Sequence, residues 1–126
     1  MKKLTAVVLF VFASSFAMLG QADNHATLRV VTVETDNVQA YVEELEKGKA
    51  IMAQVDKRML LRAWVATFAG DQTGTVIVSL EYPGSFADFA GAWQRITENE
   101  AMAAWLSGLS EVRALVSDSL YRELSI

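Results

Sequence analysis

The chain contains no cysteine, and among its 126 residues it has one histidine and one proline. Without cysteine it cannot form disulfides, thiolate zinc sites or iron–sulfur clusters, and it cannot carry the lipid of a lipoprotein cysteine. The single histidine, His25, precedes the first predicted strand, so a Ser/His/Asp triad is not available. The sequence also lacks a glycine-rich phosphate loop and an HExxH motif. These absences argue against hydrolase, kinase and zinc-enzyme functions.

Residues 1–22 have the pattern of a secretory signal peptide. Two lysines, Lys2 and Lys3, are followed by an apolar run over residues 4–19 and then by Gly20-Gln21-Ala22. The run is interrupted by two serines and is shorter than the roughly 20 residues of a membrane span. We therefore expect cleavage after Ala22 and a periplasmic or secreted protein that is not attached to a membrane after cleavage.

The remaining chain, residues 23–126, has 104 residues, a length that predicts a single domain. It carries 9 basic and 15 acidic side chains, a net charge of −6, because Lys2 and Lys3 lie in the predicted signal peptide. An acidic chain without a Lys/Arg cluster does not attract nucleic acid or an anionic membrane, so neither is expected as a partner. Without disulfides, such a small domain must be stabilised by its core, which self-association can enlarge.

The first half of this domain predicts a strand and then a long helix. Residues 28–34 are rich in β-branched side chains. They are followed by Thr35-Asp36-Asn37, three consecutive residues that are good helix N-caps. Apolar residues then recur at helical spacing as far as Val55, with charged residues on the other side. Gly48 lies inside this helix and needs a packing reason, since glycine costs about 1 kcal/mol there relative to alanine.

Two apolar runs, 60–69 and 75–82, predict a β-hairpin around the turn-forming residues 70–74. A turn symmetric about Gln72 and Thr73 would place Trp64 opposite Glu81. One face of the hairpin then carries mostly small, apolar side chains, as expected for a face that is covered by helices. The other face is mixed, which suits a wet pocket or the sheet of a partner. The mixed face contains Arg62, Trp64, Phe68, Ile77, Ser79 and Glu81.

The second half of the chain predicts a helix and a final strand. Ser85 and Asp88 form a capping-box pattern before an aromatic helix. The helical pattern resets near 97–99 and continues to about Gly108, and residues 112–124 predict a strand. The complete order is ferredoxin-like βαββαβ, an α+β fold with a four-stranded antiparallel sheet and helices on one face.

The hairpin sequence RAWVATFAGDQTGTVIVSLEYP and the helix FADFAGAW that follows it resemble the dimeric α+β barrel superfamily, including NIPSNAP-like and antibiotic-biosynthesis-monooxygenase-like domains. The resemblance extends over residues 27–124 in element order. It implies a homodimer whose two sheets pack face to face, with a pocket between sheet and helices in each subunit. The superfamily includes cofactor-free oxygenases, haem-handling enzymes and members with no assigned activity. Haem-handling members rely on a pocket histidine, which this chain does not offer, and we expect no cofactor.

Eight aromatic or charged side chains are candidates for lining that pocket. Aromatic residues at helical spacing could contact a ligand, although the same spacing is typical of a packed core. Arg62 beside Trp64 could anchor an anionic ligand, or it could form a cross-strand pair with Glu81 in a dimer interface. The candidates are Tyr41, Arg62, Trp64, Glu81, Tyr82, Trp93, Trp105 and Tyr121.

Glu34 and Glu81 each end a predicted strand, and we expect both at the same edge of the sheet. A close carboxylate pair would raise the pKa of one member enough for acid/base chemistry. The alternative interpretation is that both are solvated strand ends, which is the usual place for acidic residues.

These observations predict an exported homodimeric α+β barrel protein that binds a small apolar or aromatic molecule in a pocket between sheet and helices. Two alternatives stay open. One is a cofactor-independent monooxygenase-like enzyme that uses the same pocket, and the other is a non-catalytic structural or interaction module.

Cleavage after Ala22 would also create an N-terminus that starts Asp23-Asn24-His25. A free amine, two amide nitrogens and an imidazole can surround Cu(II) or Ni(II) in a square plane, as in the amino-terminal copper and nickel motif. A histidine at the third position can also occur by chance. Intact mass should show Asp23 as the first residue, and copper titration should give one tight equivalent that His25→Ala abolishes. A mature chain that starts at any other residue would remove this site.

Overall fold

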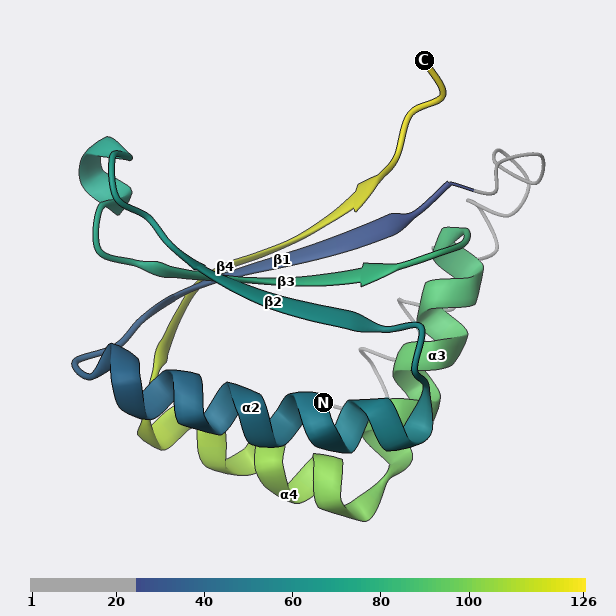
Figure 1. The fold of residues 1–126 in the computed structure, drawn as a ribbon, viewed down its shortest axis with the longest axis horizontal. Coiled ribbons are helices and arrows are strands. Elements are labelled where there is room, and N and C mark those ends of the chain that lie inside the picture. Colours follow the sequence, from purple (N-terminus) through teal and green to yellow (C-terminus); the bar gives the residue numbers. More distant parts are fainter. Residues whose placement is uncertain (1–24) are drawn as a thin grey trace.

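The computed structural model describes residues 25–126, which form a sheet with helices against one of its faces (Figure 1). The strands are β1 (Thr27–Glu34), β2 (Leu60–Val65), β3 (Val76–Tyr82) and β4 (Ala114–Arg122). Neighbouring strands are antiparallel and their spatial order is β2-β3-β1-β4. One helical connection follows β1 and a second follows β3. This is the ferredoxin-like βαββαβ fold that the sequence predicts.

The helical layer of the described residues consists of α2 (Val38–Val55), α3 (Phe86–Glu98) and α4 (Glu100–Gly108). The Asn37 side chain caps α2 by accepting the Ala40 backbone N–H at 3.0 Å. Ser85 and Asp88 form the predicted capping box of α3. The predicted interruption near 97–99 is confirmed, because Asn99 ends α3 and caps α4. None of the helices in the described part of the chain is long and apolar enough to cross a membrane.

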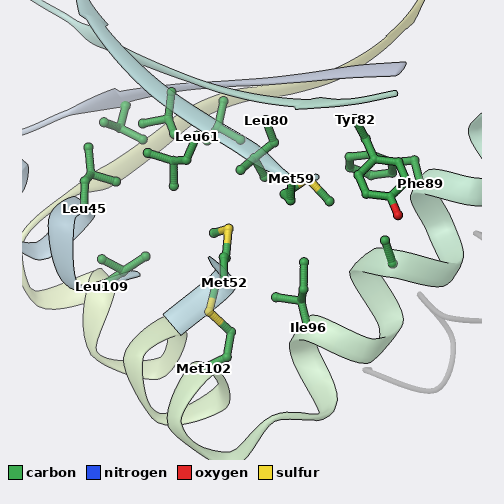
Figure 2. Close-up of a cluster of buried hydrophobic side chains, with 14 of the residues drawn as sticks. Leu45, Met52, Met59, Leu61, Leu80, Tyr82, Phe89, Ile96, Met102 and Leu109 are labelled. Atoms are coloured by element: carbon green, nitrogen blue, oxygen red, sulfur yellow. The ribbon is translucent and has the colours of Figure 1, made fainter. Parts of the chain in front are cut away.

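The hydrophobic core fills the layer between the sheet and the helices (Figure 2). Alternate residues of β3 are buried beneath the helices, as predicted for this face of the hairpin, whereas on β2 only Leu61 is buried and Val65 is 55% exposed. Figure 2 shows side chains from the sheet and from all three helices pointing into the same layer. Among the buried residues are Leu45 and Met52 of α2, Phe89 and Ile96 of α3, and Met102 of α4.

The register of the β2–β3 hairpin differs from the predicted one. Trp64 pairs with Ile77 and not with Glu81, and β2 ends at Val65. The difference amounts to four residues. Because side chains alternate with a period of two, an even shift leaves every residue of β2 and β3 on its predicted face.

The register differs because the connection is longer than a symmetric tight turn. The last backbone bonds of the hairpin join Ala66 to Thr75 and Gly74. The loop contains a 3₁₀ turn over Gly70–Gln72, and the φ angles of Gly70 and Gly74 are +57° and +93°. Phe68 therefore lies in the loop and not opposite Ile77 on the sheet, and its side chain is 99% exposed.

Close packing against Trp105 explains why a glycine, Gly48, lies inside α2. A Cβ atom added at position 48 would overlap the indole ring of Trp105. The indole N–H of Trp105 also donates a hydrogen bond to the Glu44 carbonyl oxygen, at 2.8 Å. Glycine thus allows α4 to approach α2 closely enough for this bond to form.

Gly48→Ala should lower the free energy of unfolding, although alanine is the better helix former. Displacing the Trp105 ring costs about 1 to 3 kcal/mol and also disturbs its hydrogen bond to the Glu44 carbonyl, and together these losses outweigh the gain in helix propensity of about 1 kcal/mol. Gly91 in α3 is the matched control, since a Cβ atom there would meet only Arg95 Nη1 at 3.7 Å. Gly91→Ala should stabilise the protein by up to about 1 kcal/mol. Urea unfolding of both variants checks the opposite signs, and a stabilised Gly48→Ala would contradict this explanation.

Candidate functional site

The face of the sheet that points away from the helices, here called the outer face, is not covered by any described element (Figure 1). The register aligns its central residues in three rows across the four strands. None of these twelve residues is buried, and Trp64 and Tyr121 are 54% and 55% exposed. In the order β2, β3, β1, β4 the rows are Leu60, Glu81, Leu28 and Tyr121; Arg62, Ser79, Val30 and Ser119; and Trp64, Ile77, Thr32 and Ser117.

The composition of the outer face is that of a protein interface. Six of the twelve residues are aliphatic or aromatic, and only Arg62 and Glu81 are charged. The Trp64 indole N–H donates a hydrogen bond to Ser79 Oγ at 3.2 Å, so this polar group is satisfied within the sheet. Exposed apolar side chains gathered on one face mark interaction sites, and depletion of charge is typical of interface centres.

The eight residues predicted to line one ligand pocket lie on both sides of the sheet. Because a layer of backbone separates the two sets, the structure does not bring them together. The outer-face set is Arg62, Trp64, Glu81 and Tyr121, and the set in the helix-covered layer is Tyr41, Tyr82, Trp93 and Trp105.

The helix-covered set is packed into the core. Tyr41 has no exposed surface, and its hydroxyl accepts a hydrogen bond from Arg113 Nη1 at 3.0 Å. Trp93 and Trp105 are half-buried at the margin of the core. The Phe89 ring is stacked with the Trp93 ring at 6.4 Å, and the Arg29 guanidinium lies over Trp93 at 4.9 Å. These contacts explain the aromatic pattern as core packing.

A buried polar cluster around Asp56, the residue after α2, was not predicted. The Asp56 side chain is 5% exposed. It accepts hydrogen bonds from the Tyr82 hydroxyl at 2.7 Å, from Arg95 at 3.1 Å and from Arg58 at 3.0 and 3.1 Å. The bonds from Arg58 are the main reason why the pKa of Asp56 lies well below its ordinary value. Burial, and then the bond to Asp56, raises the pKa of Tyr82.

Sequence reasoning could identify only part of this cluster. Arg58 is two residues from Asp56, and its backbone N–H donates to the Asp56 carboxylate at 3.0 Å, a local pattern typical of aspartate in turns. Tyr82 and Arg95 reach Asp56 only because β3 and α3 pack beside the end of α2. The cluster therefore joins three elements of the subunit, and we assign it a structural role.

Glu34 and Glu81 do not form the predicted carboxylate pair. Glu81 pairs with Leu28 near the start of β1, whereas Glu34 ends that strand. Six residues along a strand correspond to roughly 20 Å. The prediction is wrong because β1 and β3 run in opposite directions. The last residue of β1 and the last residues of β3 therefore lie at opposite ends of the sheet, measured along the strands.

Glu34 instead borders a hollow of about 660 Å³ at the edge where β1 ends and β4 begins. The lining is polar, with four carboxylates and the Arg113 guanidinium, and none of the eight predicted pocket residues belongs to it. Within residues 25–126, no group of three or more His, Asp or Glu side chains is placed to hold a metal ion. The carboxylates are Glu34, Asp36, Asp71 and Glu111.

The predicted N-terminal copper and nickel site lies mostly outside the described residues. Asp23, Asn24 and the predicted signal peptide over 1–22 belong to the part of the chain that the structure does not describe. His25 Nδ1 lies 3.5 Å from Glu123 Oε1. The metal site and the cleavage after Ala22 stay predictions.

The strand order and the one-sided helical layer are those of a ferredoxin-like fold, and solved structures of NIPSNAP, oxygenase and Dabb proteins confirm the predicted likeness in fold. A NIPSNAP family protein from Agrobacterium tumefaciens is 19% identical, with a TM-score of 0.62 over 82% of this chain and 89% of that chain. SnoaB, a cofactor-independent oxygenase from Streptomyces nogalater, is 10% identical, with a TM-score of 0.58 over 81% and 96%.

A Dabb family protein with a ferredoxin-like fold from Mesorhizobium loti is 10% identical, with a TM-score of 0.50 over 80% of this chain and 98% of that chain. At such identities the likeness establishes the fold. No family model and no curated protein matches the sequence.

Proposed function

We propose that the protein is an exported homodimer of the α+β barrel type that binds a small apolar or aromatic molecule between the sheet and the helices of each subunit. The homodimer is supported by the outer face, which residues 25–126 leave uncovered and which is half apolar. A second copy of the same face would remove this surface from water. Light scattering of residues 23–126 at micromolar concentration should give twice the mass of one chain, and a monomer would contradict the proposal.

Ligand binding is supported chiefly by the methionines of the core. Met52, Met59 and Met102 come from three different segments and are 2%, 5% and 0% exposed. In Figure 2 all three lie in the layer between the sheet and the helices. Methionine is unbranched and polarisable, so its side chain rearranges easily around an apolar guest. We infer that a ligand enters by displacing methionine side chains, because buried side chains fill the layer.

A thermal-shift experiment with aromatic and quinol-like compounds tests ligand binding. A compound at 100 times its Kd should stabilise the native state by about 2.7 kcal/mol and raise the Tm accordingly. Met52→Leu tests whether the methionine side chain is needed for binding. It conserves volume, so its stability should fall by less than about 1.5 kcal/mol, while the stiffer side chain weakens binding. If no compound raises the Tm, or if Met52→Leu binds as well as the unaltered protein, methionine displacement is wrong.

A cofactor-independent oxygenase is the second candidate, and the fold likeness to SnoaB is the observation that favours it. The same thermal-shift hits serve as trial substrates. Oxygen consumption with a bound compound, in the absence of added metal, would support the enzyme over the binding protein. A chain that binds none of the compounds and consumes no oxygen would be a structural or interaction module.

A further inference from the structure

The two charged residues of the outer face, Arg62 and Glu81, have no ion-pair partner within residues 25–126. Each would be covered if a second copy packed against this face. An unpaired charge is costly to bury, whereas an opposite charge on the partner offsets the loss of water. Given the proposed homodimer, these two charges indicate how its two sheets are oriented.

The positions of the two charges are compatible with a two-fold symmetric contact. Arg62 lies in the second row on β2, and Glu81 lies in the first row on the neighbouring strand β3. The sheet can be drawn as a flat grid, with strands about 4.8 Å apart and about 3.3 Å per residue along each strand. On this grid, the perpendicular bisector of the line that joins Arg62 and Glu81 crosses the middle of the sheet, between Ser79 and Val30. A two-fold axis along this bisector exchanges the two positions between the subunits.

We propose that Arg62 of each subunit forms an ion pair with Glu81 of the partner subunit, so that the dimer contains the pair twice. The partner is a second copy of this chain, and the pair selects one orientation of the two sheets. The same axis places Trp64 above Leu28 and Tyr121 of the partner subunit, so the most exposed aromatic residues of the outer face cover each other. The strands of the two sheets then cross steeply, closer to orthogonal than to aligned packing.

Charge reversal tests the pair because symmetry makes the outcome specific. Arg62→Glu alone brings two carboxylates together at each contact, and Glu81→Arg alone brings two guanidinium groups together. Each variant should raise the dimer Kd by at least about 100-fold, since juxtaposed like charges cost several kcal/mol. In an equimolar mixture, each chain meets the opposite charge twice, so a heterodimer should form with a Kd within about tenfold of the unaltered protein. The double variant Arg62→Glu/Glu81→Arg should also dimerise.

Analytical ultracentrifugation of the four proteins and the mixture gives a distinct pattern for each failure. A monomeric unaltered protein would overturn the homodimer itself. An unaltered dimer whose single variants dimerise equally well would overturn the ion pair and leave the homodimer intact. Recovery in the double variant without recovery in the mixture would place the pair within one subunit and also overturn the proposal. Circular dichroism melts of the single variants verify that both remain folded, as expected for side chains that form no ion pair within residues 25–126.

Discussion

Replacing Asp56 by alanine should lower the free energy of unfolding by about 3 kcal/mol. The substitution leaves the Tyr82 hydroxyl without its acceptor, and Tyr82 is 1% exposed. An unsatisfied buried polar group costs about 1 to 3 kcal/mol. The lost bonds to Arg58 and Arg95 add about 1 kcal/mol, because both arginines are more than half exposed and keep their water. Urea unfolding followed by circular dichroism measures the change.

Two substitutions serve as controls for this effect. Asp56→Asn keeps a carbonyl oxygen that can accept from Tyr82, so it should cost clearly less than alanine. Asp118→Asn removes a carboxylate whose bidentate bond to Arg29 is partly exposed, and it should cost about 1 kcal/mol or less. If Asp56→Ala costs no more than Asp118→Asn, the buried cluster does not stabilise the fold as described.

The same cluster predicts how stability depends on acid. The pKa of Asp56 in the folded state lies below its unfolded value of about 3.9. Its contribution is therefore fully present above that unfolded value and is lost as the pH falls below it towards the folded pKa. Between pH 5 and 2, Asp56→Asn should lose less stability than the unaltered protein. Equal acid sensitivity of the two proteins would contradict the assignment.

Val30→Asp should weaken the dimer by at least about 1000-fold. Val30 lies beside the two-fold axis inferred above, so the substitution would bring a carboxylate close to its own copy. Burying an unpaired charge costs about 3 to 5 kcal/mol, and the dimer would contain two. Such a loss corresponds to more than three orders of magnitude in Kd. Sedimentation at micromolar concentration should show a folded monomer.

Val38→Asp is the matched control for this substitution. Val38 is 41% exposed and begins α2, outside the outer face. An acidic residue in the first turn of a helix is favourable, so the variant should keep both its stability and its dimer. If Val38→Asp dissociates the dimer while Val30→Asp does not, the subunits associate through a different surface.

Local patterns predicted the elements of the fold well because each depends on residues close in sequence. The caps at Asn37 and Ser85 and the interruption at Asn99 are all contacts within four residues. The hairpin register was predicted wrongly, because the loop closes through a 3₁₀ turn over Gly70–Gln72 and not through a symmetric tight turn. Trp64 kept its predicted face only because the error was even.

The candidate site was less predictable because a pocket joins residues that are distant in sequence. Periodicity indicates that Tyr41 and Trp64 each face one side of an element. It does not indicate that the sheet separates them. The role of Asp56 could not be predicted, because its partner Tyr82 is 26 residues away in the sequence. In sequence, Tyr82 looks like any aromatic residue of a hydrophobic core. The sheet register determines which residues lie on the same side, and it also places Glu34 and Glu81 at opposite ends of the strands.

Chemical cross-linking through a single introduced cysteine tests the central claim, that two copies pack outer face to outer face. The chain has no cysteine of its own, so Val30→Cys carries a unique thiol. Packed sheets lie about 10 Å apart, so a bifunctional thiol reagent of that reach should join two Val30→Cys subunits. Val38→Cys, on the helical side, should remain uncross-linked under the same conditions. Efficient cross-linking of Val30→Cys alone is the predicted result, and a dimer in which only Val38→Cys is cross-linked would contradict the account.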